Sequence, residues 1–147
     1  MSKRQNIAKK YGLRFLSIYE PRRAIKIDKT NIEKVAKTYF KNFGYSDKEC
    51  IVAILLNGAC MYMGMELLAV GTHNVANISL RDLLRAAIVK SASKIILIHN
   101  HPSTSIVASY PDTRFFKRVR RVLSYFEIKL EANVIMGGDG ISVLSPV

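Results

Sequence analysis

The sequence predicts one domain of the mixed α/β class, because helical and strand-like patterns alternate along it. The chain has 147 residues, 49% of them apolar and 23% charged, which is ordinary for a folded globular protein. Its longest apolar run, residues 51–56, is far shorter than the roughly 20 residues that span a membrane. The first residues are polar and basic, and the chain has two cysteines. We therefore expect a cytoplasmic protein with no membrane partner and no disulfide framework.

The N-terminal third is expected to contain two short strands and one helix. Residues 14–18 and 24–27 have a sequence pattern typical of short strands, on either side of a Glu20-Pro21 turn. Thr30 and Glu33 have the spacing of a capping box, which predicts a helix that Gly44 can end. The apolar positions at helical spacing are Ile32, Val35, Ala36, Tyr39 and Phe40.

From residue 49 onward, strands and helices are expected to alternate. Residues 49–57 are typical of a buried strand that ends at an Asn57-Gly58 turn, and residues 60–70 of its partner. Ser79 and Asp82 predict the start of a helix, and the unbroken apolar run at 94–98 predicts a central strand. A second helix is expected over 111–126, followed by strands near 128–136 and 141–144. The apolar stripe expected on that helix consists of Phe115, Val119, Val122 and Phe126.

Positive charge is concentrated toward the N-terminus. Lys and Arg exceed Asp and Glu by 23 to 11, and the excess of +12 favours polyanionic partners. We expect residues 1–46 to form a basic N-terminal extension with one helix, and residues 47–147 to form the main domain. The second helix is also basic, so DNA is a possible partner. The alternative is that these basic residues only form a solvated surface. The helix's candidate nucleic-acid contacts are Arg114, Lys117, Arg118 and Arg121.

The sequence His99-Asn100-His101-Pro102 follows the predicted central strand. In an extended backbone residues i and i+2 point the same way, so both imidazoles can face one point. Asp112 follows eleven residues after His101, and two imidazoles and a carboxylate form a zinc ligand set that leaves a fourth position for water. The alternative for the histidines is ordinary polar surface. Ser109 and Asp112 also match a helix N-terminus, a role that can coexist with metal binding.

This spacing resembles the zinc signature of the JAB/MPN (JAMM) metallopeptidase fold. The shared pattern is His-x-His-Pro, with Ser109 eight residues beyond the second histidine and Asp112 three further. With the apolar run at 95–98 before it, the pattern is most similar to the bacterial RadC branch, over residues 48–144. The resemblance implies a JAB1/MPN, cytidine-deaminase-like mixed sheet flanked by helices. It also implies one zinc ion per chain, held by His99, His101 and Asp112.

The resemblance further implies a zinc-dependent hydrolase of peptide or isopeptide bonds. Glu49 occupies the position of the family's general base, and Ser109 that of the serine which hydrogen-bonds the oxyanion. The loop at 104–108 lacks the family's glycine, and Ala132-Asn133 stands where the branch often carries Asp-His. The remaining histidine, His73, is interpreted as a non-ligand. An alternative function is a nucleic-acid-binding accessory protein, in line with the traditional link of RadC to DNA repair, in which the zinc site is structural or vestigial.

Overall fold

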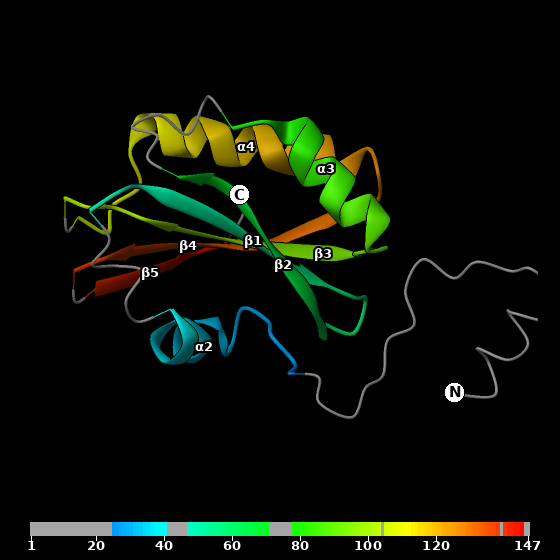
Figure 1. Cartoon of the computed structure of the whole chain (residues 1–147), viewed down its shortest axis with the longest axis horizontal. Helices are drawn as coiled ribbons and strands as arrows, with labels where there is room; N and C mark the ends of the chain where they lie inside the picture. The colour runs from blue at the N-terminus through cyan, green and yellow to red at the C-terminus, as the bar shows by residue number, and fades with distance from the viewer. Residues whose placement is uncertain (1–24, 41–46, 71–77, 104, 139, 146–147) are drawn as a thin grey trace, which may run out of the picture.

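The computed structural model describes residues 25–40, 47–70, 78–103, 105–138 and 140–145. These residues form a five-stranded mixed sheet between two layers of helices (Figure 1), which confirms the predicted fold class. Helices α3 and α4 cover one face of the sheet, and α2 covers the other. The elements are α2 (Ile32–Tyr39), β1 (Cys50–Leu56), β2 (Tyr62–Val70), α3 (Leu80–Val89), β3 (Lys94–Asn100), α4 (Tyr110–Ser124), β4 (Lys129–Gly137) and β5 (Gly140–Leu144).

The strand order is β2-β1-β3-β4-β5, which places β3 at the centre. Strand β1 pairs antiparallel with both β2 and β3, whereas β3 and β4 run parallel and are joined through α4. Strand β5 pairs antiparallel with β4 and forms one edge. Because α4 is the crossover between parallel strands, its N-terminus follows closely on the end of β3. Within the described ranges no helix is long and apolar enough to cross a membrane.

Apolar side chains fill both faces of the sheet, as the unbroken apolar runs in β1 and β3 predicted. One cluster joins alternate residues of the central strands to α3 and α4, through Leu83, Phe115 and Val119. The other joins the remaining strand residues to α2, through Ile32 and Val35. Helix α2 is therefore part of the core of the sheet. The domain boundary expected near residue 46 stays a prediction.

The start of α2 differs from the prediction. The expected capping box between Thr30 and Glu33 is wrong, because Asn31 is the N-cap and makes no side-chain capping bond. The Thr30 hydroxyl donates to Asp28 instead. Of the two short strands expected before this helix, residues 14–18 lie outside the described residues. Residues 25–27 contribute only an isolated bridge between Lys26 and Met61.

The end of α4 also differs from the prediction. The helix ends at Ser124, and Glu127 adopts a positive φ of 57° as the chain turns into β4. Phe126 therefore lies beyond the helix and is 51% exposed, so its assignment to the apolar stripe is wrong. Phe116 and Leu123 are buried along with Phe115 and Val119. The predicted cap of α3 is confirmed, since the Ser79 side chain accepts from the Asp82 amide.

Candidate metal centre

Four side chains converge at the junction of β1, β3 and α4. Glu49 directly precedes β1, His99 and His101 lie at the end of β3 and just after it, and Asp112 is in the first turn of α4. Each offers one ligand atom, and these atoms all lie within 4.8 Å of one another. The antiparallel register, in which Ile51 is opposite His99, brings Glu49 to the histidines. The group of four can therefore hold a metal ion.

The ring nitrogens of both histidines face carboxylate oxygens. Nε2 of His99 lies 2.9 Å from Oε1 of Glu49 and 3.6 Å from Oδ1 of Asp112. Nε2 of His101 lies 3.1 Å from Oδ2 of Asp112. The two imidazole rings are 4.5 Å apart between centroids and nearly perpendicular. Side chains two residues apart at the strand end thus point to one place, as their spacing predicted.

The hydrogen bond of His101 fixes its tautomer. Nδ1 lies 2.8 Å from the carbonyl oxygen of Ser105, and a carbonyl can only accept, so Nδ1 carries the proton. In the neutral ring Nε2 then has a free lone pair, and it faces an oxygen of Asp112 that also has lone pairs. Two such atoms 3.1 Å apart require a proton or a cation between them. A backbone carbonyl that orients an imidazole in this way is typical of metal-binding histidines.

His99 is buried, and burial keeps it neutral. Its side chain is 1% exposed, and its ring packs edge-on against Phe116, with ring centroids 6.2 Å apart. The pKa of His99 is lowered to about 4, mainly because burial desolvates the ring; the nearby Asp112 carboxylate opposes this shift and His101 adds to it. Nδ1 of His99 is buried and has no hydrogen-bond partner among the described residues. At neutral pH the imidazole is therefore neutral, with one ring nitrogen free of a proton, which is the form that binds metals.

Asp112 is held in place by the helix that carries it. The Ser109 side chain accepts from the Asp112 amide at 3.2 Å, and Oδ2 of Asp112 accepts from the Ser109 amide at 2.8 Å. This reciprocal capping box fixes the first turn of α4. Asp112 is only 2% exposed, yet its carboxylate faces both histidines. The helix-cap and site roles considered for Ser109 and Asp112 thus coexist geometrically.

Asn100 is a positioning residue that the sequence interpretation missed. It is fully buried; its side-chain oxygen accepts from the Cys50 amide at 2.6 Å, and its Nδ2 donates to the Lys48 carbonyl at 2.9 Å. These two bonds hold the backbone on either side of Glu49. The one sequence signal was a polar residue between the two histidines, and its partners are some 50 positions away.

A cleft of about 480 Å³ gives access to the cluster. Glu49, His101, Ser109 and Asp112 line it, together with Asp47 and the loop after β3. The side chains of Glu49 and His101 are 13% and 12% exposed, so solvent reaches them, whereas His99 lies behind. The centre is therefore closed on the core side and open on one side to a ligand.

The predicted nucleic-acid contacts are not part of this centre. Arg114, Lys117, Arg118 and Arg121 are all exposed on α4 and line a separate groove along it. The guanidinium of Arg114 lies 5.8 Å from the ring centre of Tyr110. The most basic part of the chain, before residue 25, lies outside the described residues, as does His73.

The fold and the cluster define a mixed α/β domain with a possible metal centre at the end of its central strand. A family profile described as "RadC-like JAB domain" matches residues 29–145. The chain therefore belongs to the RadC-like JAB domain family, as the sequence resemblance implied. The match includes α2 as well as the sheet and the four clustered residues.

The relatives carry a family name that states no activity. A UPF0758 protein of Caldanaerobacter subterraneus subsp. tengcongensis is 34% identical over 115 residues, which are 78% of this chain and 49% of that protein. A UPF0758 protein of Finegoldia magna is 32% identical over 112 residues, 76% of this chain and 50% of that protein. The chain thus spans about half the length of these relatives.

Proposed function

We propose that the protein is a zinc-dependent hydrolase of peptide or isopeptide bonds, with one zinc ion per chain. The observation that carries the proposal is the approach of His101 Nε2 to Asp112 Oδ2 at 3.1 Å, with the ring proton committed to Ser105. The lone pairs of His101 Nε2 and Asp112 Oδ2 therefore face each other, and a third potential metal ligand, Nε2 of His99, lies beside them. Such an arrangement is favourable around a cation.

The donor set fits zinc. Two imidazole nitrogens and a carboxylate oxygen are ligands that zinc accepts, and three protein ligands leave a coordination position for catalysis. His99, His101 and Asp112 would hold the ion. When bound, it would supply Lewis acidity, lowering the pKa of a water molecule to about 7 and polarising a carbonyl group.

Glu49 and Ser109 would carry the proton transfer and the hydrogen bonding. Glu49 lines the cleft, so its carboxylate can take a proton from water and pass it to the leaving amine nitrogen. The Ser109 oxygen accepts from the Asp112 amide, which leaves its O–H proton available to a developing oxyanion. Asn100 would keep Glu49 in position through the backbone on both sides of it.

The test compares Glu49→Gln with wild type for zinc content and for hydrolysis of a fluorogenic panel of peptides and isopeptides. We expect Glu49→Gln to keep its zinc and to lose at least about a hundredfold in rate, the scale of a positioned general base. Asp47→Asn is the matched control, because Asp47 lines the same cleft outside the group of four. Equal rates in wild type and Glu49→Gln would reject this mechanism.

A second candidate function is nucleic-acid binding by α4, with DNA as the partner. Its support is that Arg114, Lys117, Arg118 and Arg121 form no ion pair with any residue that the structure describes. Unpaired cations along one helix favour phosphate contacts. DNA affinity that falls steeply with salt, weakens in Arg118→Gln and is unchanged in Glu49→Gln would support this role. Affinity unaffected by Arg118→Gln would reject it.

A further inference from the structure

A second cleft lies between α4 and the edge strand β5. It has a volume of about 340 Å³ and shares no lining residue with the cleft of the metal centre. Phe116 of α4 and Val143 and Leu144 of β5 give it apolar walls, and Lys117 and Arg120 add two cations. Apolar walls with a few convergent polar groups are typical of sites for small organic ligands.

Asn133 of β4 lines this cleft as a buried polar group. It pairs with Leu144 across β4 and β5, so both side chains lie on the sheet face that α4 covers, and Asn133 is 2% exposed. Its side-chain oxygen is buried and has no hydrogen-bond partner within the part of the chain that the structure describes. An unpaired buried amide oxygen lowers stability, and an apolar side chain would avoid that cost. Such a group is expected where a ligand completes the hydrogen bonding.

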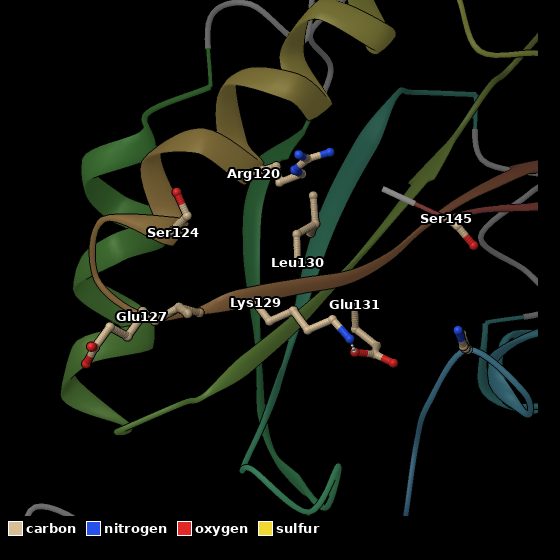
Figure 2. A pocket seen from close by; sticks show the side chains of 9 residues that line it. Arg120, Ser124, Glu127, Lys129, Leu130, Glu131 and Ser145 are labelled. Atoms are coloured by element: carbon tan, nitrogen blue, oxygen red, sulfur yellow. Dashed lines mark ion pairs between the residues drawn. The ribbon is translucent and has the colours of Figure 1, made fainter. Parts of the chain in front are cut away.

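The charge of the cleft favours an anion. Neither Lys117 nor Arg120 forms an ion pair with any described residue. Arg120 also lines the neighbouring pocket, where Figure 2 shows it extending from α4 over β4. In that pocket the Glu131 carboxylate lies 3.0 Å from the Lys129 ammonium group, which offsets its charge. The two cations of α4 are therefore available to a ligand.

We infer that this cleft binds the C-terminal end of a peptide. The terminal carboxylate pairs with Lys117 and Arg120, and the last peptide amide bonds to the side-chain amide of Asn133, which offers both an acceptor and a donor. The last side chain lies among the apolar walls. A bare phosphate group would use the cations and leave Asn133 and the apolar walls without a partner. The inference does not depend on the proposed hydrolysis, since it concerns a separate cleft.

The first experiment titrates the protein with three probes by isothermal calorimetry: N-acetylleucine, N-acetylleucinamide and inorganic phosphate. We expect N-acetylleucine to bind, and the amide and phosphate to bind at least about tenfold more weakly. Arg120→Gln and Asn133→Leu should each weaken the binding of N-acetylleucine at least about tenfold. Arg118→Gln is the matched control, because it removes the same charge from the same helix but lines the other groove, and it should bind as wild type does.

The second experiment measures thermal unfolding, which separates a ligand-binding asparagine from a structural one. Asn133→Leu should keep or raise the melting temperature, because it removes an unpaired amide oxygen. Asn57→Ala should lower it, because the Asn57 oxygen accepts from the Ala59 and Met61 amides at 2.9 Å. A decrease in the melting temperature of Asn133→Leu as large as that of Asn57→Ala would overturn the inference. So would the absence of N-acetylleucine binding, binding unchanged in Asn133→Leu, or phosphate binding of equal strength.

Discussion

Removal of the Ser109 hydroxyl should separate the structural role of this residue from its proposed chemical one. Ser109→Ala removes the acceptor that lies 3.2 Å from the Asp112 amide. Loss of one N-cap side chain costs about 1 kcal/mol, which for a domain of this size lowers the melting temperature by roughly 3 °C. Phe115, Phe116 and Val119 stay buried, so α4 should remain folded on the sheet. The zinc content should not change, because the backbone amide of residue 109 still donates to Asp112.

The matched variants are Ser109→Gly and Ser79→Ala. Glycine at an N-cap costs only a few tenths of a kcal/mol relative to serine and has no side-chain donor, so Ser109→Gly should restore most of the melting temperature while hydrolysis stays about a hundredfold or more below wild type. Ser79→Ala removes the cap of α3, whose oxygen lies 3.3 Å from the Asp82 amide, and should cost stability without loss of rate. Circular dichroism melts and the fluorogenic panel measure both quantities. Equal melting temperatures of Ser109→Ala and Ser109→Gly would refute the capping argument, and wild-type hydrolysis by Ser109→Gly would refute the oxyanion role.

Three further predictions concern the same centre. Asn100→Leu removes the acceptor of the Cys50 amide and one donor to the Lys48 carbonyl, so urea unfolding should show a loss of roughly 1–3 kcal/mol; a loss below about 0.5 kcal/mol would contradict the positioning role. Without metal, the folded protein resists protonation of His99 until about pH 4, whereas the unfolded chain takes up that proton near pH 6.5. Stability should therefore decrease as the pH falls from about 6.5 to about 4, by at most about 3 kcal/mol, and His99→Gln should reduce this pH dependence. An unchanged pH profile in His99→Gln would contradict the prediction. Zinc at 100 times its dissociation constant should stabilise wild type by about 2.7 kcal/mol and Asp112→Asn far less, as thermal melts with and without chelator would show.

Local patterns were enough to predict most of the fold. The apolar runs of β1 and β3 predicted buried strands, and Ser79 and Ser109 predicted helix starts that the structure contains. The errors lie at the ends of helices. Thr30 bonds to Asp28 rather than capping α2, and Phe126 falls beyond a helix that ends two residues earlier than predicted.

The centre was only partly accessible from the sequence. His99 and His101 are close in sequence and share a strand end, so their convergence follows from backbone geometry. Glu49 is 50 residues from His99, and only the pairing of β1 with β3 brings them together; composition alone could not have selected it. The role of Asn100 depends on the same pairing, and the unpaired oxygen of Asn133 depends on how α4 packs over β4 and β5.

The most direct test of the metal centre is elemental analysis of zinc in wild type, His101→Ala and His73→Ala. We predict about one zinc ion per chain in wild type and in His73→Ala, and almost none in His101→Ala, because His101 belongs to the cluster and His73 is interpreted from the sequence as a non-ligand. His73→Ala controls for the loss of a histidine as such. Wild type without zinc after reconstitution, or full zinc content in His101→Ala, would contradict the proposed centre.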